Sequence, residues 1–358
     1  MTTYDMTSHM QNGYVDLRSD TVTQPTPTMR KAMYEAEVGD DVYGEDPTVN
    51  RLQELSAQRL GKEAGLLVLS GTMGNLVSLL THCGRGDEAI MGDRAHTFTS
   101  EQGGSAGMGG IHPRTVPNQP EGTLDLAQVE AAIRPDNEHY PRTKLISVEN
   151  TQNNIGGRVL PPTYMHQLGS LARKHNLKVH VDGARIFNAA VALGVDASVL
   201  AQDADSLTFC LSKGLACPVG SLIVGNRDFI AEARRNRKIL GGGMRQAGVF
   251  AAAGIVALNE MIERLDDDHR NAKRLAEGIA DIAGIAIDPQ AVETNIVFFE
   301  LTSNSLTPQQ LARRLKERGV LIGAGASRRI RLVTHYGVEG EHIEQTVQTF
   351  AAVMRDAV

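Results

Sequence analysis

The chain has 358 residues, a length that suits one large domain carrying a smaller one, or two modest domains. Apolar residues make up 41% and charged residues 22%, which excludes disordered and fibrous proteins. The net charge of −6, the lack of Trp and the 4% aromatic content argue against a nucleic-acid-binding protein.

The same sequence bears on where the protein acts. The longest apolar run, 249–258, is about half of what a bilayer span needs, and residues 1–13 are too polar for a secretory signal. The three cysteines, Cys83, Cys210 and Cys217, are odd in number and lack CxxC spacing. They fit reduced thiols better than a disulfide framework or a zinc site. We therefore expect a cytoplasmic protein without membrane contact or a metal centre.

Short apolar runs alternate with amphipathic stretches from Val15 onward, a pattern typical of a mostly parallel sheet covered by helices. Residues 1–14 show no such periodicity and are expected to form a tail. The predicted strands are 65–69, 88–91, 144–149, 178–181, 206–211 and 221–224. The predicted helices are 48–60, 73–83, 126–133, 162–175 and 228–238.

The pattern changes toward the C-terminus. The apolar content of 246–265 predicts one long buried helix, and 266–278 is charged and amphipathic. A strand at 296–301, a helix at 308–318, a strand pair around 320–322 and 330–333 and a last helix from Glu341 then form an α+β unit. The sequence thus predicts an α/β fold with a large domain, 15–262, and a smaller C-terminal α+β domain, 263–358.

A small-residue turn follows the first predicted strand. Residues 70–75 read SGTMGN and lead directly into a helix. Backbone N–H groups and the positive end of the helix converge at such a turn, which suits a phosphate group. A tight turn that only glycine permits is the alternative interpretation.

Two charged residues follow other predicted strands. Asp182 comes at the end of the run VHVD, where open α/β sheets bind ligands, although a helix cap or a turn would also explain it. Lys213 ends the run SLTFCLSK. A desolvated lysine is a nucleophilic amine, whereas a lysine that reaches out to solvent is the commoner case.

Together these three features predict a pyridoxal-phosphate site. The coenzyme needs a phosphate cradle, a lysine for a Schiff base and an acid that keeps its pyridine nitrogen protonated. The turn, Asp182 and Lys213 occur in chain order, and 31 residues separate the last two, which leaves room for a helix between adjacent strands.

In these motifs and in their order along the sequence, the chain resembles the L-threonine aldolases, including the low-specificity and L-allo-threonine enzymes. The resemblance runs from Val15 nearly to the C-terminus and implies a pyridoxal-phosphate enzyme of the aspartate-aminotransferase fold (fold type I), with a mostly parallel sheet flanked by helices. The segments that carry it are 16–21 (DLRSDT), 39–44 (GDDVYG), 70–75 (SGTMGN), 180–185 (HVDGAR), 211–214 (LSKG), 241–246 (GGGMRQ) and 331–335 (RLVTH).

The resemblance implies roles for residues that hold the coenzyme. Lys213 matches the Schiff-base lysine, and Asp182 matches the partner of the pyridine nitrogen. Gly71 and Thr72 match the phosphate turn. Arg185 matches an arginine beside the phenolic oxygen of the ring and the substrate, and His96 matches the histidine that stacks on the ring face.

Other residues are matched to the substrate. Arg331 matches the arginine that binds the substrate carboxylate, helped by the Ser19 hydroxyl, because a planar guanidinium holds a carboxylate bidentately. Cross-strand pairing by Arg331 and turn capping by Ser19 are the alternatives.

The resemblance also implies shared active sites. Lys238, Arg245 and the substrate-binding Tyr43 match residues that lie near the active site across a subunit contact, which implies a homotetramer with its sites at subunit interfaces. A solvated basic helix face is the alternative for Lys238.

The implied reaction is retro-aldol cleavage of L-threonine or a related β-hydroxy-α-amino acid to glycine and an aldehyde, with β-elimination or transamination as the alternative. The sequence departs from many relatives at 149–152, ENTQ, where they carry histidine in place of Gln152. An amide does not titrate, so the base that removes the hydroxyl proton is expected to be His96 or His139. For His139 an exposed loop residue is the equal alternative.

Overall fold

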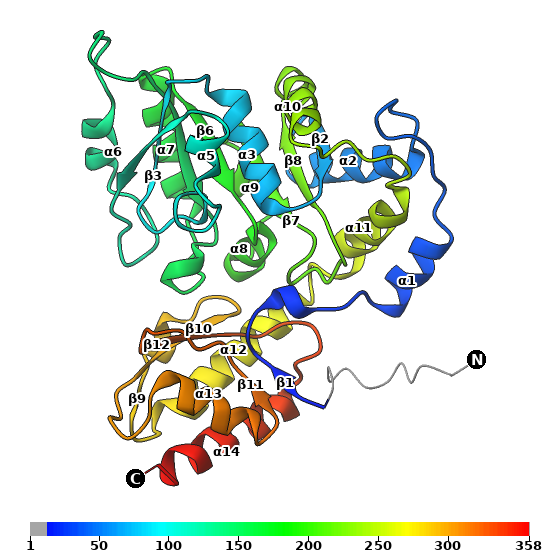
Figure 1. The fold of residues 1–358 in the computed structure, drawn as a ribbon. Helices are drawn as coiled ribbons and strands as arrows, with labels where there is room; N and C mark the ends of the chain where they lie inside the picture. The colour runs from blue at the N-terminus through cyan, green and yellow to red at the C-terminus, as the bar shows by residue number, and fades with distance from the viewer. Residues whose placement is uncertain (1–12, 358) are drawn as a thin grey trace.

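The computed structural model describes residues 13–357, and its largest element is a seven-stranded sheet (Figure 1). In spatial order the strands are β2 (Ala64–Val68), β8 (Ser221–Gly225), β7 (Ser206–Cys210), β6 (Lys178–Asp182), β5 (Thr143–Glu149), β3 (Glu88–Gly92) and β4 (His112–Val116). All neighbouring pairs are parallel except those that β8 makes with β2 and β7. The predicted α/β class, with a mostly parallel sheet, is confirmed.

Helices cover both faces of this sheet, and side chains along each strand alternate between two cores. Leu66, Val68 and Ile223 pack on one face against α3 (Gly71–His82) and α10 (Arg227–Ile239). The intervening Leu67 points into the main core on the other face. That core is completed by α2 (Pro47–Arg59), α6 (Leu126–Ala132), α7 (Pro162–Lys174), α8 (Ile186–Leu193) and α9 (Ala197–Ala201).

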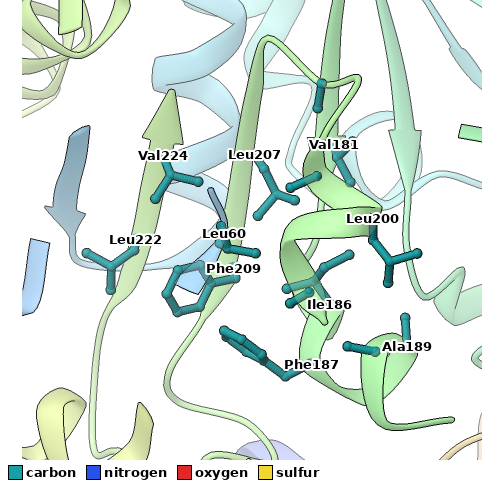
Figure 2. Packing of buried hydrophobic residues seen from close by; sticks show 14 of the residues in the cluster. Leu60, Val181, Ile186, Phe187, Ala189, Leu200, Leu207, Phe209, Leu222 and Val224 are labelled. Carbon is teal, nitrogen blue, oxygen red and sulfur yellow. The ribbon is translucent and has the colours of Figure 1, made fainter. Parts of the chain in front are cut away.

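Two aromatic residues lie at the centre of the main core (Figure 2). Phe209 of β7 and Phe187 of α8 meet edge to face, with ring centroids 5.2 Å apart and an interplanar angle of 85°. This is a favoured aromatic geometry. Leu207 and Ile186 extend the same apolar layer, so β7 and the helix that follows β6 are locked together. Asp182 ends β6, and Lys213 follows the end of β7.

The C-terminal part has a core of its own. Its three-stranded antiparallel sheet has the order β12 (Arg329–Val333), β10 (Ile296–Leu301), β9 (Ile285–Ala286). The helices α12 (Leu265–Ala280), α13 (Pro308–Lys316) and α14 (Gly340–Arg355) pack with it in a second hydrophobic cluster. We propose that the two cores mark two domains that meet between α11 (Gly248–Glu260) and α12.

The N-terminal strand joins this second core. In β1 (Val15–Asp16), Val15 pairs in parallel with Val320 of β11 (Val320–Leu321), and Val15 and Leu17 are buried in the C-terminal cluster. This differs from the sequence analysis, which grouped Val15 with the larger domain. Residues 1–12 of the expected tail lie outside the described residues.

Most predicted bounds agree with the structure to within two residues, and the exceptions involve long-range pairing. The expected helix 246–265 is shorter than predicted: α11 ends at Glu260, and the chain turns at 261–264 before α12 begins, although no Gly or Pro marks the break. The expected strand pair of the C-terminal unit is also wrong. β11 pairs with β1, and β12 pairs with β10.

Several short elements were not predicted. They are the strands β1, β4 and β9, the helices α8 and α9, and also α1 (Pro27–Tyr34), α4 (His96–Thr99), α5 (Gly104–Gly107) and the 3₁₀ helices η1 (Asp20–Val22), η2 (Asn153–Ile155) and η3 (Pro289–Ala291). Across residues 13–357, none of the helices is both long and apolar enough to cross a membrane.

Candidate active site

The candidate residues gather at one edge of the large sheet. Asp182 ends β6, Glu149 ends the adjacent β5, and the two residues are partners in the strand register. Lys213 follows the end of the next parallel strand, β7. Because β2 and β7 both run antiparallel to β8, the carboxyl end of β2, with the turn at Ser70, opens at the same edge. Ligands of open α/β sheets bind at this edge.

The turn after β2 has the features that a phosphate group requires. The Ser70 hydroxyl caps α3 by accepting from the Met73 N–H at 3.2 Å. The first N–H groups of a helix have no partner within the helix, so those at Gly71 and Thr72 are suited to an anion. A Cβ atom on Gly71 would lie 2.8 Å from the Sγ atom of Cys210, so only glycine lets the turn sit this close to β7.

Asp182 is buried and held by two N–H donors. Its Oδ2 atom accepts from Nδ2 of Asn75 at 2.8 Å, and its Oδ1 atom accepts from the Ala184 N–H at 3.1 Å. These two donors fix the orientation of the carboxyl group. The half-buried Lys213 lies at the end of the neighbouring strand, where its carbonyl oxygen accepts from the Thr23 hydroxyl at 2.9 Å.

His96 is oriented by two carboxylates. Its backbone N–H donates to Oε2 of Glu149 at 2.9 Å, and its Nδ1 atom lies 2.7 Å from Oε1 of the buried Glu101. The hydrogen bond with Glu101 raises the pKa of His96; burial opposes this, and the charge of Asp182 adds to it. With Nδ1 engaged by Glu101, Nε2 is the ring nitrogen left for chemistry.

His96, Glu101 and Asp182 also form a set with metal-ligand character. One ligand atom from each lies within 4.8 Å of the others. The Asn75 amide donates to Oε1 of Glu101 as well as to Asp182, at 2.8 Å each. Because N–H donors thus already point at both carboxylates, we assign this cluster to an organic coenzyme and not to a cation.

Arg185 forms a buried bidentate pair with Asp20. Its Nε and Nη2 atoms donate to the two carboxylate oxygens of Asp20 at 2.6 and 2.7 Å. Burial would raise the pKa of Asp20, but the Arg185 guanidinium outweighs this effect and holds that pKa well below its ordinary value. Asp20 is therefore a permanent anion that fixes the plane of the Arg185 side chain.

Arg331 lies beside Arg185 and shares a partner with it. Oδ1 of Asn153 accepts from Nη1 of Arg331 at 2.8 Å and from Nη1 of Arg185 at 3.3 Å. Burial, and then the charge of Arg185, lower the pKa of Arg331. Asp20 balances one of these two guanidinium charges and the Asn153 amide is neutral, so one positive charge is left, which suits a carboxylate ligand. Ser19, at the start of η1, precedes Asp20, and its hydroxyl accepts from Thr21 N–H at 3.2 Å.

The segment after β5 ties these groups together. Oε1 of Glu149 accepts from the Asn153 N–H at 3.1 Å, and burial, followed by the charge of Asp182, raises the pKa of Glu149 to about 7. The buried Gln152 donates through Nε2 to the Arg94 carbonyl oxygen at 2.9 Å and to Oε2 of Glu149 at 3.2 Å. Its Oε1 atom accepts from the Ile155 N–H at 2.8 Å. The Gln152 side chain is therefore a structural amide with three hydrogen bonds.

Four predicted residues lie outside this cluster within one chain. His139 is exposed in the connection before the amino end of β5, the edge opposite Glu149. Tyr43 is 75% exposed, and Lys238 is exposed near the end of α10. Arg245 is exposed too, with Nη1 2.9 Å from Oδ2 of Asp40.

The structure adds site residues that the sequence analysis did not single out. They are Asp20, Asn75, Glu101, Glu149 and Asn153. Asp20, Asn75 and Glu149 lie inside motifs quoted above, but their burial and partners could not be read from the motifs. Glu101 and Asn153 lie outside those motifs, and nothing in the sequence around them indicated a place in the site.

Comparison with known proteins places this geometry in a family. The family model described as beta-eliminating lyase matches residues 16–302. Low-specificity L-threonine aldolase 1 of Arabidopsis thaliana is 50% identical over 344 residues, which cover 95% of this chain and 96% of the relative. The chain belongs to the threonine aldolase family.

One other relative agrees with this placement, and a solved structure shares the fold. The low specificity L-threonine aldolase of Escherichia coli (strain K12) is 47% identical over 340 residues, covering 95% of this chain and 99% of that protein. A solved threonine aldolase structure from Leishmania major has a TM-score of 0.80 at 19% identity, covering 95% and 99% of the two chains. The fold is that of pyridoxal-phosphate enzymes of fold type I, as expected.

The enzymes of this family use pyridoxal phosphate, and the site fits that coenzyme. The turn at Gly71 offers N–H donors to the phosphate, Lys213 offers its amine, and Asp182 offers a buried anion for the ring nitrogen. His96 lies 4.8 Å or less from Asp182, by its nearest ring nitrogen, so it is within reach of a ring held between them. The protein is therefore a lyase with pyridoxal phosphate as its coenzyme.

Proposed function

We propose that the enzyme splits L-threonine, L-allo-threonine and related β-hydroxy-α-amino acids into glycine and an aldehyde. The observation that carries this proposal is the pair Arg331 and Arg185, joined by Asn153, beside the coenzyme residues Asp182 and Lys213. An amino acid bound there has its carboxylate on the two arginines and its amine toward Lys213. The relatives named above as threonine aldolases support the same activity.

Substrate orientation determines which bond breaks. Arg331, Arg185 and the Ser19 hydroxyl would hold the substrate carboxylate, and the orientation that they impose would select which bond at Cα is cleaved. Asp20 keeps Arg185 in place through its bidentate pair. When bound, the coenzyme supplies an electron sink for the electron pair of that bond, and Asp182 keeps the ring nitrogen protonated.

His96 is the favoured base. In its neutral form the Nδ1–H group donates to Glu101, and Nε2 is free to take the proton of the β-hydroxyl group. Loss of that proton turns the β-carbon and its oxygen into the aldehyde as the Cα–Cβ bond breaks, and a proton added to Cα completes glycine. His139 is exposed at the opposite edge of the sheet, so it serves this role only if another subunit brings it to the site.

We also propose a homotetramer with active sites at subunit interfaces. Apolar side chains are exposed in the segments around Tyr43, Lys238 and Arg245, namely Tyr43 itself, Ile239 at 77% exposure and Phe250 at 40%. Asp41 and Asp40 tie the loop that carries Tyr43 to α10 and to Arg245 through ion pairs of 2.7 and 2.9 Å. A preformed surface of this kind suits a second copy of the chain. Sedimentation as a fully active monomer would contradict it.

We propose the cytoplasm as the compartment, which is supported by the three buried, unpaired cysteines. Fractionation of cells that express the protein tests this assignment, and recovery outside the cytoplasmic fraction would contradict it.

The decisive experiment is a product assay with the purified enzyme. L-Threonine and L-allo-threonine are expected to yield equal amounts of glycine and acetaldehyde. Pyruvate and ammonia from L-serine, or a keto acid from an added amino-acid pair, would instead indicate β-elimination or transamination. Absence of any glycine from every 3-hydroxylated amino acid tested would reject the proposal.

A further inference from the structure

A buried chain of hydrogen bonds runs through the large domain and ends at Asp182. Nε2 of His82 lies 2.7 Å from the hydroxyl oxygen of Ser206, which lies 2.8 Å from Nδ1 of His180. Nε2 of His180 lies 3.2 Å from Oδ1 of Asn75, and Nδ2 of Asn75 donates to Asp182 at 2.8 Å. All of these residues are buried except His82, which is half-buried.

The direction of each hydrogen bond in the series follows from Asp182 and Glu101, the two carboxylates next to Asn75. Nδ2 of Asn75 faces both Asp182 and Glu101, which only accept hydrogen bonds when ionised. A reversed amide would turn its oxygen toward both carboxylates. Oδ1 of Asn75 therefore faces His180, whose Nε2 atom must carry a hydrogen.

The remaining bonds follow in the same direction. With its hydrogen on Nε2, His180 accepts at Nδ1 from the Ser206 hydroxyl, and the Ser206 oxygen accepts from Nε2–H of His82. Burial lowers the pKa of His180 to about 3 and that of His82 to about 4, so both rings are neutral. A neutral imidazole has one donor and one acceptor, and both are used by the hydrogen bonds of His180.

His82, at the outer end of this series of hydrogen bonds, is also held in place. The His82 ring stacks on Phe229 of α10, with centroids 4.6 Å apart and an interplanar angle of 21°. Asn75 has no titratable group, so the chain cannot pass a proton to Asp182. Its effect is to orient the Asn75 amide.

We propose that His180 is a positioning residue for the coenzyme, which acts through Asn75 to keep an N–H donor on Asp182, with Ser206 and His82 fixing the tautomer of His180. This rests on the part of the proposed function in which Asp182 faces the ring nitrogen, and it does not require aldol cleavage. An amide held in this way stabilises the Asp182 anion, and the anion in turn stabilises a protonated ring nitrogen.

The test compares three substitutions at one position. His180→Leu removes both hydrogen bonds, His180→Gln places an amide N–H where Nε2 lies, and His180→Asn reaches only as far as Nδ1. Each variant is titrated with pyridoxal phosphate and with its 1-deaza analogue, in which CH replaces the ring nitrogen. The analogue has no ring nitrogen for Asp182 to bind, so it reports on every other part of the site.

We expect His180→Leu and His180→Asn to bind pyridoxal phosphate about tenfold more weakly, since a hydrogen bond to a charged group is lost. Binding of the deaza analogue is expected to change less than about twofold, and His180→Gln is expected to recover most of the affinity for pyridoxal phosphate. The pH midpoint of the visible absorbance of the bound coenzyme is expected to shift with the same ranking.

Other outcomes would overturn the positioning role. Equal weakening of both ligands would mean that His180 only supports packing, and unchanged binding in His180→Leu would remove it from the site. If His180→Leu fails to fold, Ser206→Ala decides, with a smaller loss expected for pyridoxal phosphate alone. One outcome separates the two proposals. If the wild-type enzyme binds pyridoxal phosphate more tightly than the deaza analogue and His180→Leu does not, the positioning role is supported. If the same wild-type enzyme does not cleave L-threonine, the proposed function is rejected.

Discussion

Two cationic regions of this molecule are built in opposite ways. Arg185 is 6% exposed, its guanidinium makes two hydrogen bonds with Asp20, and Asp20 is fully buried. The Arg245 side chain is 57% exposed and makes one ion pair with Asp40, whose side chain is 18% exposed. The first region is complete within one chain, whereas the second presents charge and apolar surface outward.

The difference indicates how each region acts. Buried ion pairs are costly to break, because removal of one partner leaves an unpaired charge away from water. Exposed pairs contribute little to stability, because water solvates both partners. Loss of Asp20 or Arg185 should therefore affect folding and chemistry together, and changes around Arg245 should affect activity only through contacts with another subunit.

The largest effect is expected from Lys213→Ala. The amine that links to the coenzyme is lost, so the rate of glycine formation should fall by ~10³-fold or more. The fold should persist, because the hydrogen bond from Thr23 reaches the backbone carbonyl of residue 213 and not its side chain. Glycine release and far-UV circular dichroism measure the two effects. A rate near that of the wild type would remove Lys213 from the mechanism.

Asp20→Ala and Asp40→Ala form a matched pair that tests the comparison directly. Asp20→Ala leaves Arg185 buried and unpaired, so the free energy of unfolding should fall by about 3–5 kcal/mol. Asp40→Ala leaves Arg245 solvated and removes an acceptor for the N–H groups of Val42 and Tyr43, so its loss of stability should be much smaller. Chemical denaturation of both variants measures these values. Equal losses would show that burial does not separate the two regions.

Glu101→Gln tests the orientation of His96 through pH dependence. The hydrogen bond with Glu101 raises the pKa of His96, and the base must be unprotonated to act. Without that carboxylate the pKa falls, so the acidic limb of kcat/KM should move to lower pH, and kcat should drop by about 10²-fold as the ring loses its fixed orientation. Asp182, Glu149 and Lys213 also face this site.

His96→Gln is the control for that profile. It should lose the same limb altogether, because an amide does not titrate. An unchanged midpoint in Glu101→Gln would mean that His96 is not the group that titrates in the reaction.

The parts of the molecule that could be predicted from sequence depend on local pattern. The strands of the large sheet are short apolar runs, and the residues that end them, Asp182 and Lys213, stand out against that background. Adjacent parallel strands then bring these two residues to one edge whatever the rest of the chain does. The coenzyme site was predictable for this reason.

The remaining features depend on contacts between distant segments. Asp20 and Arg185 are 165 positions apart, and nothing in the local sequence indicates that both are buried. A charged residue is assigned to the surface unless its partner is known. In the same way, the pairing of β1 with β11 was missed because Val15 meets Val320 only once the whole chain has folded.

The smallest effect on the isolated chain, and the sharpest test of the exposed region, is expected from Arg245→Ala. Its stability should change by less than about 0.5 kcal/mol, because the side chain is solvated and makes one surface ion pair. If Arg245 completes the site of another subunit, activity should still fall, by about tenfold. Mixing Arg245→Ala with the inactive Lys213→Ala chain should then restore activity, because one site of a mixed assembly has both residues intact. Both substitutions would fall in one site, and leave another intact, only if the sites are shared, so mixtures no more active than their components would place the whole active site within one chain.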